Sequence, residues 1–177
     1  MAPSLDVEAL TTPMASARRA PLMLFLVSAA VVGAALLFQY VGGLAPCELC
    51  LYERWPYYSV AALALAAVLI GSPMASRIVL ALSALAFLAS VALAFYHVGV
   101  EQHWFAGPAA CTAGGTGPPA NFEEYKRRLM EQQVVACDQP QWRLFGVSLA
   151  GFNLLASLVL AFGSFLAARR PRATARR

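Results

Sequence analysis

Two cysteines separated by two residues are the part of the sequence best suited to chemistry. Cys47 and Cys50 lie within Pro46–Cys50, where a polar stretch leads into an apolar one. If a helix begins there, its unpaired N–H groups and its dipole favour a thiolate, which lowers the pKa of a cysteine and makes it nucleophilic. The spacing therefore predicts a dithiol that exchanges disulfides and electrons.

A lone CxxC also fits half of a zinc site or a structural disulfide. His97, His103, Cys111 and Cys137 could supply further zinc ligands. However, the sequence has no second CxxC and no closely spaced pair of histidines, which zinc sites usually have. Redox chemistry without a metal is therefore the prediction, and a structural bridge and a metal site are the alternatives.

Arg54 is the charged residue best placed to act with this dithiol. On a continuous helix Cys47, Cys50 and Arg54 would lie at positions i, i+3 and i+7, and so would share one face. A guanidinium at the edge of an apolar segment could stabilise the Cys50 thiolate, donate hydrogen bonds to a quinone carbonyl, or do both. The alternative is an interfacial arginine that pairs with Glu53 or with a lipid phosphate.

The other two cysteines lie far from the CxxC in the sequence. Cys111 is in a stretch rich in Gly and Pro that has little capacity to bury it, and Cys137 follows 26 positions later. An exposed cysteine in a mobile loop suits attack by another protein, and Cys137 is its expected mate. The alternative is a disulfide that only closes the loop.

Membrane helices must position these residues. Of the 177 residues, 60% are hydrophobic and only 12% are charged, which is too apolar for an ordinary soluble domain. Stretches without Asp, Glu, Lys or Arg occupy residues 20–47, 55–76, 78–100 and 144–168, and each exceeds the roughly 20 residues that cross a bilayer. Because lipid cannot satisfy bare backbone groups, we expect an all-α bundle of four transmembrane helices, at about 22–41, 55–71, 77–97 and 144–166.

The remaining segments are two loops and two tails. Residues 42–54 and 98–143 are the expected loops of a membrane domain at 21–168, with a disordered tail at 1–20 and a basic tail at 169–177. A secretory signal is disfavoured because the first apolar segment is too long. In the second loop, Asn121 as an N-cap and the apolar spacing after it predict a short amphipathic helix, lying on the membrane surface or packed on the bundle.

The basic residues predict the orientation. Eight of the 13 lie on one side of the expected bundle: Arg18, Arg19, Arg77, Arg169, Arg170, Arg172, Arg176 and Arg177. By the positive-inside rule this side, with both termini, is cytoplasmic. All four cysteines then lie on the outer side, where disulfides persist. The net charge of +4 is thus a topology signal and does not indicate nucleic-acid binding.

Together these residues resemble a known family. The residues that carry the resemblance are Phe38-Gln39-Tyr40, Pro46-Cys47, Cys50, Tyr52-Glu53-Arg54, Cys111, Cys137 and Gln141-Trp142. They resemble the DsbB family of disulfide bond formation proteins, over residues 22–168. The resemblance implies a protein-dithiol:quinone oxidoreductase of a bacterial inner membrane, which oxidises a DsbA-like thioredoxin-fold protein of the periplasm and reduces ubiquinone or menaquinone.

The resemblance also implies a role for each site residue. Cys111 would form the mixed disulfide with the partner, and Cys137 would then pair transiently with Cys47. Cys50 would be left as a thiolate against the quinone, with Arg54 holding that quinone. His97 matches a family histidine near the quinone, and a core or interfacial histidine is the alternative.

Two other functions stay open from the sequence. A vitamin K epoxide reductase-like protein also has four helices and two cysteine pairs, but its quinone-side CxxC lies late in the chain. A structural four-span protein, such as a tetraspanin-like organiser, would use its cysteines as staples, but the Cys-Cys-Gly signature is missing here.

Overall fold

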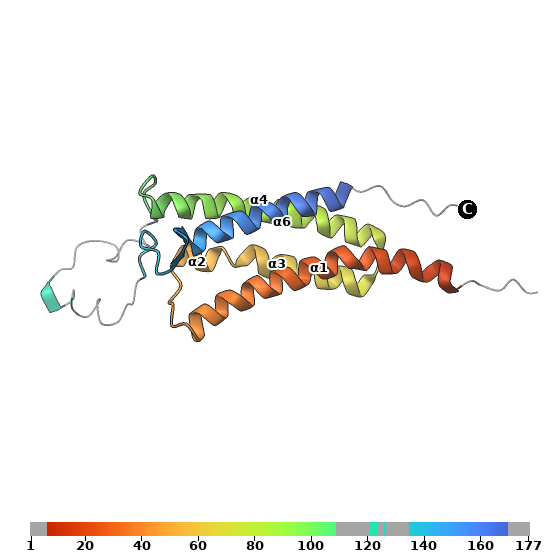
Figure 1. The fold of residues 1–177 in the computed structure, drawn as a ribbon, viewed down its shortest axis with the longest axis horizontal. Helices are drawn as coiled ribbons and strands as arrows, with labels where there is room; N and C mark the ends of the chain where they lie inside the picture. The colour runs from red at the N-terminus through yellow and green to blue at the C-terminus, as the bar shows by residue number, and fades with distance from the viewer. Residues whose placement is uncertain (1–6, 109–120, 124–125, 127–134, 170–177) are drawn as a thin grey trace, which may run out of the picture. The chain divides into compact units, whose positions relative to one another are not determined.

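The computed structural model describes residues 7–108, 121–123, 126 and 135–169. They divide into two compact units: unit 1 contains the described residues of 7–33, 56–89 and 157–169, and unit 2 those of 34–55 and 90–156. The elements follow in the order α1 (Val7–Tyr40), α2 (Glu48–Tyr52), α3 (Trp55–Ile70), α4 (Pro73–Glu101), β1 (Arg143–Leu144), β2 (Val147–Ser148) and α6 (Leu149–Arg169) (Figure 1).

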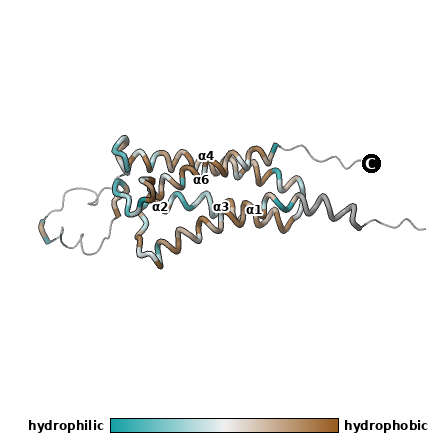
Figure 2. Tube along the Cα trace, in the orientation of Figure 1, coloured by the Kyte–Doolittle hydropathy of each residue, from teal (hydrophilic) through white to brown (hydrophobic). Residues whose placement is uncertain are grey.

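Three helices of the described residues are long and apolar enough to cross a membrane. By length and composition these spans are Ala17–Tyr40, Pro73–Glu101 and Leu149–Arg169. Figure 2 shows the hydrophobic residues that dominate them. The described fold is therefore helical apart from one small hairpin, and its composition is that of a membrane protein.

The remaining predicted span, at 55–71, is a helix but a short one. With 16 residues α3 is about 24 Å long, less than the roughly 30 Å hydrocarbon core of a bilayer. Pro56 explains why α3 does not continue from α2, because proline lacks an N–H and its ring clashes with the carbonyl of Tyr52. The expected count of four spans is thus not confirmed within the described residues.

The first helix starts earlier than predicted. α1 begins at Val7, inside residues 1–20, for which the sequence predicts a disordered tail. Glu8, Ala9 and Leu10, near the start of α1, are all strong helix formers. Helix propensity therefore outweighs the polar character from which disorder was inferred.

The last helix starts later than predicted, because a hairpin precedes it. The sequence predicts a helix from residue 144, but Arg143 pairs with Ser148 and Leu144 with Val147 in two antiparallel strands. Phe145 and Gly146 have φ angles of 52° and 81°. Two positive φ angles in succession make the turn whose twist matches a two-residue hairpin, so α6 cannot begin before Leu149.

Two predictions fall outside the described residues. The amphipathic helix expected after Asn121 lies mostly there, and so does Cys111. Both stay predictions.

Unit 1 is packed around one aromatic side chain. The ring of Tyr57 lies edge-on to Phe87 at 5.3 Å between centroids, and its hydroxyl is 3.0 Å from that of Ser157. Ala64 and Ala67 are buried in the same cluster. Small residues at such positions let membrane helices approach closely, and the alanine-rich stretches of the sequence supply them.

Candidate redox site

The dithiol lies at the start of a short helix, as the sequence predicts. Cys47 is the N-cap of α2, and its Sγ accepts a hydrogen bond from the backbone N–H of Cys50 at 3.2 Å. Both cysteines are free thiols, and their Sγ atoms lie 2.7 Å apart. A disulfide needs about 2.05 Å, so only a small movement of the sulfurs is required when an acceptor removes two electrons and two protons leave.

Two contacts hold the loop that carries Cys47 in place. The side-chain amide of Gln141 donates to the carbonyl of Ala45 at 2.8 Å. Beside it the Trp142 ring packs between Phe38 of α1, at 5.5 Å, and Phe152 of α6, at 6.2 Å. Trp142 thus fixes the loop against two helices.

The two thiols differ in acidity. The hydrogen bond from the Cys50 thiol, helped by that from the Cys50 backbone, holds the pKa of Cys47 below the ordinary value for a cysteine. The same hydrogen bond, together with burial, raises the pKa of Cys50 well above it. Cys47 is therefore the thiol that loses its proton first, and Cys50 keeps its proton to a higher pH.

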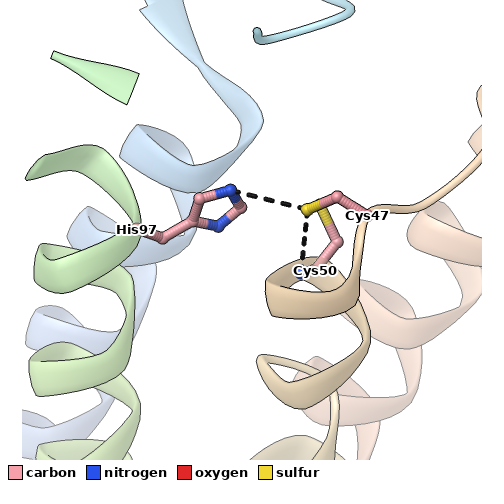
Figure 3. Close-up of side chains that lie close together, drawn as sticks. All are labelled: Cys47, Cys50 and His97. Carbon is pink, nitrogen blue, oxygen red and sulfur yellow. Dashed lines mark hydrogen bonds between the residues drawn. The ribbon is translucent and has the colours of Figure 1, made fainter. Parts of the chain in front are cut away.

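His97 lies beside the dithiol. It extends from α4 toward the start of α2, and its Nε2 lies 3.6 Å from the Sγ of Cys47 (Figure 3). The other ring nitrogen, Nδ1, lies 2.8 Å from Oε1 of Glu53. A carboxylate can only accept, so Nδ1 carries a proton and Nε2 is the nitrogen that faces the Cys47 sulfur.

Glu53 was not identified as a site residue from the sequence, where it was considered as a partner for Arg54 and as part of the run that resembles the family. It is 7% exposed, and its second oxygen accepts a hydrogen bond from Nδ2 of Asn153 at 2.9 Å. The sequence did contain a signal for such a role: Glu53 lies beside an apolar segment, and an acidic residue that becomes buried there nearly always has a partner. Neither His97 nor Asn153 could be identified as that partner, since they lie 44 and 100 positions away in the chain.

Arg54 does not continue the helical face of the cysteines. α2 ends at Tyr52, and the backbone N–H of Arg54 bonds to the carbonyl of Leu51 in a tighter turn. The guanidinium is half-buried, and its Nη1 donates to Oε1 of Gln39 on α1 at 2.7 Å. The arrangement at i, i+3 and i+7 expected from the sequence is therefore broken, because Pro56 interrupts the helix.

Cys137 lies with the dithiol although it is distant in sequence. It is disulfide-bonded and 2% exposed, and it belongs to one buried cluster with Cys47, Leu49 and Val100. Cys50 packs against this cluster. Three of the four predicted redox cysteines are thus brought together, and the fourth, Cys111, is outside the described residues.

Known proteins resemble the chain along most of its length. The family model described as "Disulfide bond formation protein DsbB" matches residues 17–167. Disulfide bond formation protein B of Aromatoleum aromaticum is 30% identical over 165 residues, which cover 88% of this chain and 95% of the relative. The protein of that name from Methylococcus capsulatus is 30% identical over 158 residues, covering 85% and 93%. That from Stutzerimonas stutzeri is 28% identical over 155 residues, covering 84% and 92%. With the dithiol and its membrane helices, these matches show that the chain belongs to the DsbB family, thiol oxidoreductases of disulfide bond formation.

Proposed function

We propose that this chain reoxidises a DsbA-like thioredoxin-fold protein in the periplasm and passes the electrons through two cysteine pairs to a membrane quinone. The observation that carries the proposal is the common burial of Cys47 and Cys137 in one cluster. In a relay between two cysteine pairs, a sulfur of one pair must come within bonding distance of a sulfur of the other pair. Neither alternative drawn from the sequence, the vitamin K epoxide reductase-like protein or the structural protein, has a comparable observation in its favour.

The first half of the relay takes electrons from the partner. A partner thiolate attacks Cys111, a mixed disulfide forms, and Cys137 leaves as a thiolate. In the structure Cys137 is disulfide-bonded and Cys47 and Cys50 are free. The proposal assigns Cys111 to Cys137 as its mate. The Cys137 thiolate then attacks Cys47, which breaks the Cys47–Cys50 disulfide and leaves the electron pair on Cys50.

The second half returns the loop pair to its oxidised form. The second thiolate of the partner releases Cys111, which attacks Cys137 and expels Cys47 as a thiolate. A sulfur with a lowered pKa is the better leaving group, and the hydrogen bonds to Cys47 lower its pKa. The result is an oxidised Cys137 above a reduced dithiol, the same redox state that these three cysteines have in the structure.

His97 handles the proton in this scheme. Its Nε2 faces the Cys47 sulfur while Nδ1–H is held by Glu53, so the ring keeps one orientation as it gains and loses a proton. Because the Cys50 thiol hydrogen-bonds to Cys47, a proton can leave Cys50 through Cys47 and His97. Glu53 and Asn153 are positioning residues, since they act on the sulfurs only through His97.

The chemistry around Arg54 fits a quinone. A guanidinium carries five N–H donors and the Gln39 bond uses Nη1, so other donors can reach a quinone carbonyl. Trp55 beside it is 64% exposed and offers an apolar surface for a ring. A bound quinone, ubiquinone or menaquinone, supplies the acceptor for the two electrons of the dithiol. Arg54 would hold it, and His97 would lie on the proton path.

The proposed location is the inner membrane of a bacterium, with the cysteines on the periplasmic side and both termini in the cytoplasm. Eight of the 13 basic residues support this orientation. The oxidising periplasm also suits the disulfide at Cys137.

Two single substitutions test the relay by separating its half-reactions. Cys111→Ala should abolish reaction with a reduced DsbA-like protein, while the dithiol still reduces added quinone. Cys50→Ala should do the reverse, trapping the partner but not reducing quinone. Gel shift of the mixed disulfide and quinone absorbance measure the two halves separately. Normal partner oxidation by Cys111→Ala, or equal loss of both halves in both variants, would overturn the relay.

A further inference from the structure

We propose that the reduced site also binds a soft divalent metal ion, of the class of Zn²⁺ or Cd²⁺, which blocks the dithiol. One ligand atom from each of Cys47, Cys50 and His97 lies within 4.8 Å of the other two. Two thiolates and one imidazole are a typical ligand set for zinc, and three protein ligands leave a fourth position open.

The separations between the ligand atoms decide how the ion would fit. With Zn–S of about 2.3 Å and Zn–N of about 2.0 Å, tetrahedral geometry places a sulfur and a nitrogen ligand about 3.5 Å apart and two sulfurs about 3.8 Å apart. The Cys47 sulfur and Nε2 of His97 already lie 3.6 Å apart. The two sulfurs, at 2.7 Å, must separate by about 1 Å, which a rotation of the Cys50 side chain provides.

The surroundings of His97 favour a metal ligand. The bond between Nδ1 and Glu53, at 2.8 Å, fixes the tautomer that leaves Nε2 free to coordinate, and Asn153 holds the carboxylate at 2.9 Å. This is the carboxylate–histidine pair that commonly supports a bound metal. Cys47 and His97 are 4% and 3% exposed, so water competes weakly for the ion.

Binding exchanges protons and transfers no electrons. The two thiols release two protons as two thiolate–metal bonds form, and neutral His97 completes the set. A Cys47–Cys50 disulfide offers no thiolate, so the oxidised protein cannot bind the ion this way. A metal held by the dithiol would therefore block reoxidation whenever the reduced form accumulates. This last consequence rests on the proposed function, whereas the binding itself does not.

The test uses the full chain in detergent with Cys111→Ala and Cys137→Ala, so that Cys47 and Cys50 are its only thiols. After reduction and removal of the reductant, Cd²⁺ is titrated while the ultraviolet thiolate-to-metal absorbance and the released protons are recorded. Zn²⁺ is measured by competition with a chromophoric chelator. We expect one ion and two protons per chain, and no binding after oxidation to the disulfide.

Substitution of the imidazole separates the proposed site from simple chelation by a dithiol. His97→Ala should weaken the affinity by at least 10-fold, and Glu53→Gln by about 10- to 100-fold. The control is His103→Asn, since His103 is exposed and asparagine tolerates its positive φ of 59°. If His97→Ala binds as tightly as its parent, or if the reduced parent binds no ion, the proposal is wrong. Neither readout needs quinone or a partner, so this result is independent of the relay.

Discussion

Cys47 and Cys50 share one hydrogen bond, and this makes them chemically unequal. The sequence predicts a lowered pKa at the helix start but favours Cys50 as the thiolate, with Arg54 beside it. In the structure Cys47 accepts a hydrogen bond from the backbone N–H of Cys50, and Arg54 donates to Gln39 instead. The difference arises because an N-cap sulfur faces the free N–H groups of the helix, whereas a residue one turn later does not.

The first prediction concerns the pH dependence of this pair. In the reduced protein the rate of alkylation of Cys47 should reach half its maximum at a lower pH than that of an ordinary cysteine, and the rate for Cys50 at a higher pH. Only the thiolate reacts, so each rate falls as the pH drops through the pKa of that thiol. Mass spectrometry after timed exposure to iodoacetamide measures both residues.

The midpoint is compared, not the rate, because Cys47 is the more buried of the two. In Cys50→Ala the midpoint for Cys47 should rise, since the thiol that donates to it is gone. A lower midpoint for Cys50 than for Cys47 would contradict the assignment of the thiolate.

The second prediction concerns Arg54 as a quinone ligand. A hydrogen bond to a charged group contributes roughly 1.5–3 kcal/mol, so Arg54→Ala should weaken apparent quinone affinity by about 10- to 150-fold. Arg54→Lys keeps the charge but loses the planar guanidinium, so its quinone affinity should lie between that of the wild type and that of Arg54→Ala. Quinone titration of the purified protein measures the effect, and single-turnover oxidation of the partner should change much less.

Arg77→Ala is the matched control, because Arg77 donates to the carbonyl of Ala168 within unit 1. If Arg54→Ala had an unchanged half-saturation and turnover, Arg54 would be only a structural or lipid-facing residue. Gln39→Ala should cause a smaller loss of quinone affinity, because it removes the hydrogen-bond partner of the guanidinium but not the guanidinium itself.

At the scale of elements, the sequence predicts helices well and their interruptions poorly. Long stretches without charged residues predict α1, α3, α4 and α6, because the length and apolarity of a segment can be judged from the local sequence alone. The break before Pro56 and the hairpin turn at Phe145 and Gly146 depend on single residues. Counting charges over about twenty residues does not detect these interruptions, although Pro56 and Gly146 in the sequence indicate a break and a turn.

The third prediction concerns the C-terminal end of α4, where Gly99 lets a loop fold back. A Cβ at Gly99 would lie 2.2 Å from the Phe105 ring, which stacks on Tyr96 at 5.9 Å. Gly99→Ala gains about 0.5–1 kcal/mol of helix propensity, but overpacking costs about 1–3 kcal/mol. The midpoint of thermal unfolding in detergent should therefore fall.

Gly163→Ala on α6 provides the comparison, because nothing lies within 4 Å of a Cβ there. The same substitution should raise the unfolding midpoint at that site. In a Phe105→Ala background Gly99→Ala should also become neutral or stabilising. If Gly99→Ala still lowered the unfolding midpoint without the Phe105 ring, the clash would not be the cause.

At the scale of the whole molecule, the site depends on contacts that local sequence patterns cannot predict. Cys47, His97 and Asn153 come from the start of α2, from α4 and from α6, and Glu53 joins the last two. The CxxC spacing identified Cys47 as a site residue, and the resemblance to a family added His97. Glu53 and Asn153 needed the fold, because their partners lie far away in the chain.

The last prediction is the orientation of the chain in the membrane. A reporter fused after Arg170 should be active in the cytoplasm, and one inserted at Gly114 should be active in the periplasm. The charge argument is the excess of basic residues on one side, eight against five, and a disulfide at Cys137 fits an oxidising compartment. Paired reporters, one active only in the cytoplasm and one only after export, measure both positions, with expression checked by immunoblot. Because the two termini should lie on the same side, a fusion at the N-terminus should match the Arg170 result. If the Gly114 reporter were cytoplasmic, the cysteines would face a reducing compartment, and neither the relay nor its periplasmic partner could be maintained.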